Sequence, residues 1–582
     1  MAIYRADQAI VTFGTEAAQG GVPEGASAVT DGTGDNLINM SSGLPAGSRS
    51  ITVDSTSGIT AGEFIQIGPD IESETNIYRN AEIRRVEFVE GTTDGKLHLD
   101  TPTAFFHVDN SKVQVVTATT DTDDDKIMTF IPGVYETVDV PDPEMAIEPR
   151  YLLGTSSNRN YYTQYKSSQS YNGSIGSFIL LNGWPLRFPM GKVTSIPVGG
   201  TITSRTDLNG DHKKGDMWIN VDSATNLAAG DLITIDYAAT PTRTDVCEVR
   251  RLVAVSGTTR FKLNYPLQFD HPALTSSTQI REIEATPTYY QHDVWETIDL
   301  DSISWNVLLR DSAGTTANDF IRRYYGGKVG GASLSASEEG MLTMSWDGIT
   351  FMGMNHNQAD HTNLSEEYQA SQAMPGFGLM QTIDDADMTG AIATTASSYA
   401  LRDRAYPQTN PYFFSQGTIS MFNTSIEFAR IRDFNISIDN SIEPKYYLNT
   451  RHGKLNRGPS ETREGNRSYS MSATIALPDS TAATADTQTL FKELLLEGDY
   501  GTTASPSNKG FAIDLVFTRG TNDSITISIP ADGVANAGGN GSGAFINSAT
   551  HNVGGSGALE VAANMMFRNM KIQIKDSVPL YP

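Results

Sequence analysis

Apolar and polar residues alternate in short runs along most of the chain. In Phe511–Phe517 (FAIDLVF), alternate positions are large and apolar, as on a strand with one buried face, and Ser524–Ile529 (SITISI) repeats the pattern. Arg519–Asp523 between them is short enough for a turn, so a β-hairpin is predicted. Leu334–Trp346 predicts a second hairpin around Glu339–Gly340. Strands with one apolar face and short turns predict antiparallel sheets packed as sandwiches or barrels.

A long internal repeat divides the chain. Ile147–Thr155 (IEPRYLLGT) recurs as Ile442–Thr450 (IEPKYYLNT), with six of nine residues identical. Each copy is followed by a polar stretch and then by a strand that begins with tyrosine, at Tyr171 and Tyr469. Two matches in nearly the same register indicate a duplicated domain.

A second repeat lies within the N-terminal part of the chain. Ile51–Gly68 (ITVDSTSGITAGEFIQIG) resembles Ile219–Asp236 (INVDSATNLAAGDLITID), and the likeness continues from EIRRVEFVEGTT at Glu82 to EVRRLVAVSGTT at Glu248. We interpret the two copies as small β modules inserted into loops of the first large domain. The expected layout is a first domain made of residues 1–40, 119–197 and 284–355, modules at 41–118 and 198–283, and a second domain at 356–582.

One segment has a helical period instead. Thr484–Gly498 (TADTQTLFKELLLEG) has apolar residues at helical spacing, a Thr or Asp cap at its start and a glycine stop. It predicts a helix that packs against a sheet. The matching place in the first copy, Leu181–Gly191, contains Pro185 and Pro189, which forbid a regular helix through it.

Composition narrows the function classes. The 582 residues carry a net charge of −26, which disfavours a basic nucleic-acid-binding face and suits a wall along which DNA slides without sticking. Cys247 is the one cysteine, so no internal disulfide forms, and we expect it to be a buried strand residue. No apolar run is long enough for a membrane span, and the first residues lack the apolar core of a cleaved signal peptide.

The weak chemical motifs in the sequence are better explained by structural roles than by metal binding. Asp207, Asn209 and Asp211 alternate as in a Ca²⁺ loop, but His212 stands where the turn needs glycine and Trp218 where a bidentate glutamate belongs. We therefore expect a polar turn there. His356, Asp360 and His361 could chelate a metal, yet they lack helical framing and further ligands.

Catalytic signatures are missing from the sequence. Gly538–Gly557 lacks the strand–turn–helix context of a phosphate-binding loop and is interpreted as a flexible loop. The small polar residues of the longer segment Ala531–Gly557 predict that it is flexible in the free subunit and orders only when rings stack. The chain contains no HExxH, GxSxG, P-loop or paired CxxC motif. We predict a protein that is not an enzyme, with no catalytic, cofactor-binding or metal-binding residues and no cofactor.

The order of these elements resembles bacteriophage major tail tube proteins of the siphovirus type, in particular those with a tandem tube domain. The likeness rests on the two IEP segments with their tyrosine-led strands, on the hairpin at Lys328–Gly348, and on the sequence of strands and helix that follows Arg432. It covers most of the chain outside the two inserted modules.

The resemblance implies an all-β fold with two tandem tube domains of sandwich or barrel type, each with few helices, plus the two inserted modules. In the family, the inner sheets of neighbouring subunits join to line a lumen, and a long loop and an arm bridge stacked rings. The resemblance thus implies a virion subunit, made in the host cytoplasm, that polymerises into the tail tube and conducts DNA during ejection without specific binding. Tape measure, tail terminator and distal tail proteins would be its partners, and no membrane is involved.

Ring stoichiometry follows from the repeat. Tube rings in the family are commonly sixfold with one tube domain per position, so a chain with two domains predicts three chains per ring and pseudo-hexameric symmetry. We expect the modules on the tube exterior, where either could be deleted without loss of assembly, and a lumen of negative potential. The alternatives are another virion structural protein, of the baseplate or a capsid decoration, and a β-rich host-surface or carbohydrate-binding adhesin.

Overall fold

The computed structural model describes most of residues 9–356 and 410–581. Its longer gaps are residues 17–35, 116–128, 152–162, 310–319, 357–409, 422–429, 448–457, 477–509, 534–542 and 552–559, and shorter gaps occur elsewhere. The helix predicted at Thr484–Gly498, two of the three possible metal ligands (Asp360 and His361) and most of the predicted flexible segment lie outside the described residues. We call the chain before residue 357 the first half and the chain after residue 409 the second half.

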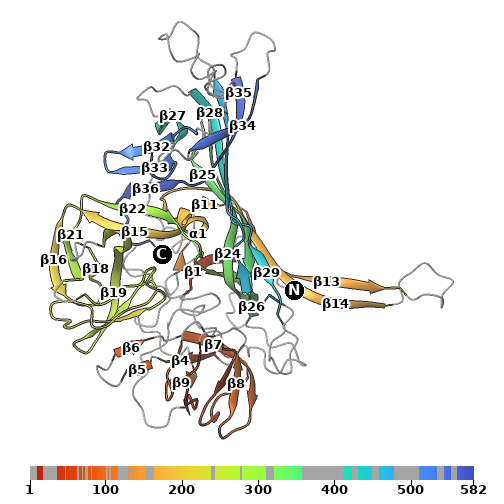
Figure 1. Cartoon of the computed structure of the whole chain (residues 1–582), viewed down its shortest axis with the longest axis vertical. Helices are drawn as coiled ribbons and strands as arrows, with labels where there is room; N and C mark the ends of the chain where they lie inside the picture. Colours follow the sequence, from red (N-terminus) through yellow and green to blue (C-terminus); the bar gives the residue numbers. More distant parts are fainter. Residues whose placement is uncertain are drawn as a thin grey trace, which may run out of the picture.

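The chain has an all-β fold, as predicted, and one long sheet crosses both halves (Figure 1). Within this 14-stranded sheet the strands β14-β25-β24-β28-β31-β35-β34 lie side by side. Their bounds are β14 (Thr163–Ile179), β24 (Phe320–Ser337), β25 (Thr343–Phe351), β28 (Arg430–Asp439), β31 (Ser468–Ala476), β34 (Ala544–His551) and β35 (Glu560–Phe567). We call this run of strands the long sheet.

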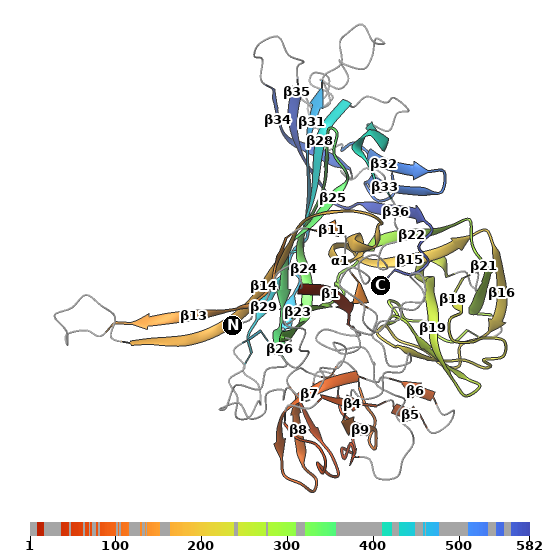
Figure 2. The same ribbon diagram turned by 180° about the vertical axis from the view of Figure 1, so that it is seen from behind.

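Further strands extend the long sheet at the first half. The N-terminal part of β24 pairs β23 (Ile303–Leu309) and β26 (Gly353–His356), and β23 continues to β1 (Ala9–Thr15) and β10 (Thr129–Phe130). Along the other edge of β14 lie β11 (Val134–Tyr135), β12 (Val138–Asp139) and β13 (Pro143–Arg150). The hairpin of β13 and β14, which we call the arm, extends away from the body in both views (Figure 2).

A six-stranded outer sheet packs on one face of the long sheet and also mixes the halves. Its order is β15-β22-β36-β33-β32-β27. The strands are β15 (Gly191–Val198), β22 (Tyr289–Glu296), β27 (Gly417–Met421), β32 (Ile513–Gly520), β33 (Asp523–Ile529) and β36 (Lys571–Asp576). The predicted hairpins are present as β32–β33 and β24–β25, and Glu339 takes a left-handed backbone (φ 63°) in the turn of the second.

Apolar side chains from both sheets form the main core. Trp305, Trp346 and Phe178 are fully buried there together with the alternate apolar residues of the long sheet. Pro185 and Pro189 limit Leu181–Gly191 to short turns, a 3₁₀ turn η3 (Trp184–Leu186) and one helical turn α1 (Arg187–Met190). Two further 3₁₀ turns are described, η4 (Thr244–Val246) and η6 (Phe414–Gln416).

The inserted repeat corresponds to two sheets with the same strand order. The strand order is β2-β9-β4-β7-β8-β3 in module 1 and β16-β21-β18-β19-β20-β17 in module 2. Each strand of one module therefore has a counterpart at the same place in the other. The module 1 strands are β2 (Asn36–Leu37), β3 (Ser50–Thr52), β4 (Phe64–Ile67), β7 (Glu82–Glu90), β8 (Lys96–Leu99) and β9 (Lys112–Val115), and β2 precedes the expected start of the module at residue 41. The module 2 strands are β16 (Thr201–Thr206), β17 (Trp218–Asn220), β18 (Leu232–Ile235), β19 (Glu248–Ser256), β20 (Arg260–Leu263) and β21 (Ile280–Ala285).

The modules differ in one connection. Module 1 has a small hairpin of β5 (Asp70–Glu72) and β6 (Ile77–Arg79) where module 2 has η4, and β6 lies against β17 of module 2. Each module has its own apolar cluster. Module 2 lies on the side of the body opposite the arm (Figure 1). The two remaining described strands, β29 (Glu443–Lys445) and β30 (Glu461–Arg463), form a short hairpin.

Candidate assembly surface

The long sheet has one apolar face and one polar face. Along β24, β28 and β31 the side chains that point toward the outer sheet are buried and apolar, whereas their neighbours in sequence point the other way. This period-two pattern follows from the pleat of a strand. The outward side chains of the long sheet are small and polar on most strands: Asn172 and Ser174; Thr343, Ser345, Asp347 and Thr350; Ser333, Ser335 and Ser337; Asp433, Asn435, Ser437 and Asp439; Ser468, Ser470, Ser472 and Thr474; and Glu560 and Asn564.

The ionisable residues in this outward set are all acids. Ser345 and Ser333 donate hydrogen bonds to the carboxylate of Asp347, and Ser335 and Thr343 are in hydrogen-bond contact across the strands. Hydroxyl and amide groups thus cross-link neighbouring strands and leave the acids with negative charge on the surface. A predominantly acidic surface of this kind repels polyanions. Two basic side chains lie at this face and are paired with carboxylates, Arg432 with Glu560 and Glu338, and Lys328 with Glu464.

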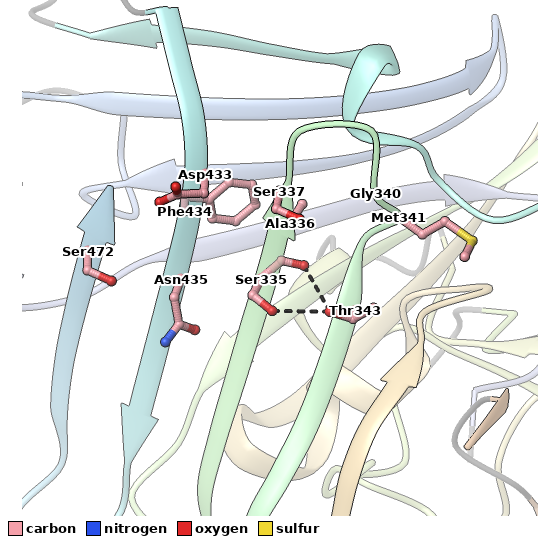
Figure 3. Close-up of a pocket in the computed structure, with 10 residues that line it drawn as sticks. All are labelled: Ser335, Ala336, Ser337, Gly340, Met341, Thr343, Asp433, Phe434, Asn435 and Ser472. Carbon is pink, nitrogen blue, oxygen red and sulfur yellow. Dashed lines mark hydrogen bonds between the residues drawn. The ribbon is translucent and has the colours of Figure 1, made fainter. Parts of the chain in front are cut away.

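A pocket of about 390 Å³ lies on the polar face where the halves meet (Figure 3). Its lining comes from the turn of β24–β25 and from the facing parts of β28 and β31, including Ser335, Thr343, Asp433, Asn435 and Ser472. These are hydroxyl, amide and carboxylate groups with no histidine, cysteine or lysine among the lining residues. The pocket therefore provides hydrogen-bonding groups and one negative charge.

The halves are joined by direct strand pairing. Gly331–Ser337 of β24 pairs Asp433–Asp439 of β28 in unbroken register. Beyond the paired strands, Asn440 continues the contact, because its N–H donates to the carbonyl of Gly330 at 2.7 Å and its side chain donates to the carbonyl of Val329 at 3.0 Å. The side chain of Ile442 lies over Gly330, where an added Cβ would come within 3.3 Å of it.

A nearly buried ion pair completes this junction. Lys328 Nζ contacts Glu464 Oε1 at 2.6 Å, and the N–H of Leu300 donates to the same oxygen at 2.9 Å. Burial opposes ionisation of Glu464, but the Lys328 ammonium and the N–H donor outweigh it and lower the pKa of Glu464 below its usual value. The ion pair holds the loop before β31 against β24.

The two halves use the same strand registers around their tyrosines. Phe351 lies opposite Tyr171 across β25–β14, and Phe567 lies opposite Tyr469 across β35–β31. The preceding strand repeats too, since Pro143 faces Tyr171 and Ile438 faces Tyr469. Each outer hairpin also has a bulge at the same place, between Val329 and Gly331 in β24 and between Ile546 and Ser548 in β34.

The arm exposes large apolar residues. The exposed fractions are 57% for Ile147, 69% for Tyr151 and 59% for Tyr165. The short β29–β30 hairpin lies beside the base of the arm, where the Tyr446 hydroxyl donates to the carbonyl of Gln169 at 2.9 Å. Apolar side chains held in solvent on a projecting hairpin mark a surface that another chain can cover.

Charged groups fasten module 2 to the body. Asp301, before β23, contacts Arg187 of α1 at 2.5 Å and also pairs Lys214 of module 2. Although burial opposes its ionisation, the two cations lower the pKa of Asp301 to about 2. The N–H of Val193 donates to the Gln268 side chain at 3.0 Å. Module 2 and the body therefore share a buried polar contact.

Module 2 also contains a buried ionic cluster that sequence reasoning missed. His271 lies between Asp236, at 2.8 Å from Nδ1, and Glu248, at 3.0 Å from Nε2. Burial alone would lower the pKa of His271, but the two carboxylates raise it. Arg250 pairs the same Glu248. A signal was available, since His107 of module 1 is buried at the corresponding place after the PxxF segment.

The predicted Ca²⁺-like turn is used for internal hydrogen bonds. Asp207 accepts the N–H of Gln279 at 3.2 Å, and Asp211 accepts the N–H of Ala273 at 2.9 Å. Their carboxylates bind backbone groups of module 2 and do not converge on a common point. Cys247 is fully buried, and burial raises the pKa of its thiol well above the usual value.

A serine, a histidine and an aspartate come together in the core without being predicted. Ser195 Oγ is 2.8 Å from His292 Nδ1, and His292 Nε2 is 3.3 Å from Asp576. Tyr581 stacks on the imidazole with a centroid distance of 3.7 Å, and its hydroxyl donates to Asp576. Because all these side chains are buried, a substrate has no access, and the cluster serves to pin the segment after β36 onto β15 and β22.

The described part of the chain contains neither a metal-binding cluster nor a membrane-spanning helix. Within the described ranges, no three His, Cys, Asp or Glu side chains are grouped so that they could hold a metal ion. None of the helices in the described part of the chain has the length and apolar character needed to cross a bilayer.

Comparison with known proteins gave one match. A family model described as "Phage tail tube protein" matches residues 238–568, which is more than half of the chain and extends from module 2 to the end of β35. The search of curated proteins found no match.

Proposed function

The chain belongs to the phage tail tube protein family, and we propose that it polymerises into the hollow tube of a siphovirus-type tail and conducts DNA during ejection. Membership of the family makes it a structural component of the virion tail. The observation that carries the finer proposal is the long sheet with its small, polar and acidic outward face. Such a face suits the wall of a channel for a polyanion, and we assign the protein no enzymatic role.

The proposed tube subunit contains two tube domains in tandem. Support comes from the matched registers around Tyr171 and Tyr469 and from the bulges at the same place in β24 and β34. In this proposal the pairing of β24 with β28 is a joint between two neighbouring positions of a ring, made within one chain. The first domain is interrupted by modules 1 and 2.

The polar face of the long sheet forms the lumen wall in this proposal. The acids Asp347, Asp433 and Asp439 give the wall negative potential, so DNA phosphates meet repulsion instead of counterion-releasing contacts. Module 2 lies on the opposite side of the body from the arm and docks on β15 of the outer sheet, which suits a place on the tube exterior. Module 1 is proposed to lie outside as well.

Three chains form each ring in the proposed tube. Two tube domains per chain and six positions around the channel give threefold symmetry, with joints within chains alternating with joints between chains. The arm, with its exposed Ile147, Tyr151 and Tyr165, is placed to reach an adjacent ring. A tape measure protein inside the tube and terminator and distal tail proteins at its ends complete the proposed partners. The subunit is made in the host cytoplasm before assembly.

Helical reconstruction of tubes assembled from the purified protein tests these proposals together. We expect hollow cylinders with three chains per ring, Asp433 and Asp439 facing the channel, and both modules outside. Six full-length chains per ring would overturn the tandem arrangement, and a lumen lined mainly by lysine and arginine would overturn the channel wall. A protein that stays monomeric under all assembly conditions would argue against the tube itself.

A further inference from the structure

Among the described residues of a single chain, two edges of the long sheet are largely open. In the part of the chain that the structure describes, β34 pairs β35 on one side, and its other edge is bridged by Phe511 at Ala544 and carries no strand beyond that point. Beside this edge, Phe545 and Met566 form a cross-strand pair on the otherwise polar face, with exposed fractions of 36% and 51%. At the opposite end of the long sheet, Ile147 at the base of the arm is 57% exposed.

The junction between the halves is a template for what covers these edges. Lys328 lies opposite Thr350 in the β24–β25 hairpin, and Phe545 lies opposite Met566 in the β34–β35 hairpin. Because the two hairpins share their register, Phe545 is the counterpart of Lys328 and Met566 is the counterpart of Thr350. On the other side of the junction, Ile147 is the counterpart of Ile442 in the repeated IEP segment.

The same reasoning places Lys166 at the position of Glu464. Glu443 faces Arg463 in the short hairpin and Glu148 faces Tyr165 in the arm, so the next residue of each second strand corresponds as well. Ile147 lies directly opposite Lys166 in the arm. Within the chain, Ile442 and Glu464 both lie against β24, at Gly330 and Lys328. Ile147 and Lys166 therefore occupy the face that a neighbouring β34 would meet.

We propose that Phe545 and Met566 of one copy pack against Ile147 and the aliphatic stem of Lys166 of a second copy, as an apolar joint between chains. This inference rests on the proposed function and adds to it the residues of the joint and its chemistry. The joint within the chain is an ion pair at the same place, Lys328 with Glu464. The two kinds of joint thus differ in chemistry although they share strand geometry.

An apolar contact suits this joint because its strand ladder lacks a donor. Pro143 stands where Ile438 pairs Ala332 in the template, and proline has no N–H to donate. Side chains must then contribute more to the contact than in the joint within the chain. A proline at an open edge also hinders unwanted strand pairing by other chains.

The residue at the bulge of β34 affects how closely Ile147 of the second copy can approach. Asn547 replaces Gly330, so Ile147 cannot lie as close to the strand as Ile442 does. The Asn547 side chain instead donates toward the sulfur of Met566 at 3.9 Å, and Phe545 is 36% exposed. The unlike edges complement each other and not themselves, so the joint is head-to-tail and can close a ring.

A cysteine pair tests the register directly. Gly331 lies opposite Asp439, next to the hydrogen-bonded pair of Gly330 and Asn440. Hydrogen-bonded and non-hydrogen-bonded pairs alternate along an antiparallel ladder, and the latter bring Cα atoms to about 4.5 Å, close enough for a disulfide. The counterparts are Ser548 and Glu144, and the native Cys247 is buried. We expect assembled Ser548→Cys/Glu144→Cys protein to give covalent trimers on mild oxidation. Ser548→Cys/Glu148→Cys, four residues out of register, should not cross-link.

A charge exchange tests the chemistry. Phe545→Lys places an ammonium opposite Lys166 and should abolish assembly, measured by sedimentation and electron microscopy. Adding Lys166→Glu recreates the Lys328–Glu464 pair between chains and should restore tubes. Ile298→Lys changes an apolar residue of 91% exposure outside the joint and should assemble normally.

The outcomes separate the joint from the tube. The joint would be overturned if the wild-type protein forms tubes but assembled Ser548→Cys/Glu144→Cys protein does not cross-link. Normal assembly of Phe545→Lys would overturn it too. Either result would leave the proposed function standing. Failure of the wild-type protein itself to form tubes would count against the proposed function. Circular dichroism of each variant shows that a loss of assembly is not a loss of folding.

Discussion

Asp301 offers the sharpest test of how module 2 is held. Its carboxylate is 8% exposed and touches two cations, Arg187 from the body and Lys214 from module 2. The fall of its pKa from 3.8 to about 2 is nearly two units, and at about 1.36 kcal/mol per unit it corresponds to roughly 2–3 kcal/mol of folding free energy. We predict that Asp301→Asn lowers the free energy of unfolding by this amount at pH 7.

The direction of the pKa shift determines how the stability difference between wild type and Asp301→Asn depends on pH. Because the folded pKa is depressed, the stabilisation by Asp301 is fully present above pH 3.8 and is lost as the pH falls toward 2. The gap between wild type and Asp301→Asn should therefore close between about pH 4 and pH 2. Urea unfolding followed by tryptophan fluorescence at a series of pH values measures it.

Asp299→Asn is the matched control, since Asp299 is exposed and two residues away. It should change the unfolding free energy by less than about 0.5 kcal/mol. A double-mutant cycle of Asp301→Asn with Lys214→Met isolates the link between module 2 and the body. If Asp301→Asn behaves like Asp299→Asn at pH 7, or if its gap does not depend on pH, the buried contact does not hold module 2 as described.

Three further changes probe other parts of the fold. His271→Gln should remove a stabilisation that is fully present below pH 6.5 and lost as the pH rises through the raised folded pKa, so thermal scans from pH 6 to 9 should show the wild type converging on the variant. Tyr581→Phe leaves Asp576 without its hydroxyl donor and should cost about 1–3 kcal/mol in urea unfolding. Gly326→Ala places a Cβ 2.5 Å from the sulfur of Met352 at a φ of 67°, so it should lower the unfolding free energy by about 1–3 kcal/mol, and an unchanged melting temperature would contradict the strain.

Alternation along single strands was enough to predict the hairpins but not the sheets. The pattern of Leu334–Trp346 identifies which side chains are buried, yet it carries no information on which strand lies next to β24. That neighbour is β28, about 100 residues later, and the pairing depends on the packing of both halves. The same limit applies to β22 with β36.

The candidate surface was partly accessible from the sequence. The net charge of −26 and the IEP repeat led to the expectation of an acidic wall and a doubled domain, which enter the proposal. The Lys328–Glu464 pair left no local signal, because its partners are 136 residues apart in the chain. Buried His271 could have been found, since comparing the modules beyond their strands aligns it with His107.

The pairing of β22 with β36 has a consequence for synthesis on the ribosome. Asp293 of β22 binds Gln573 of β36, which is made 280 residues later. At ~5–20 residues per second, the outer sheet waits roughly 15–60 s for this strand while β22 is already outside the ribosome. During that interval the core that β36 covers is open to solvent, and contacts so distant in sequence form slowly. Nascent chains are thus aggregation-prone in this interval, and a chain truncated before β36 lacks a strand on which both halves of the sandwich depend.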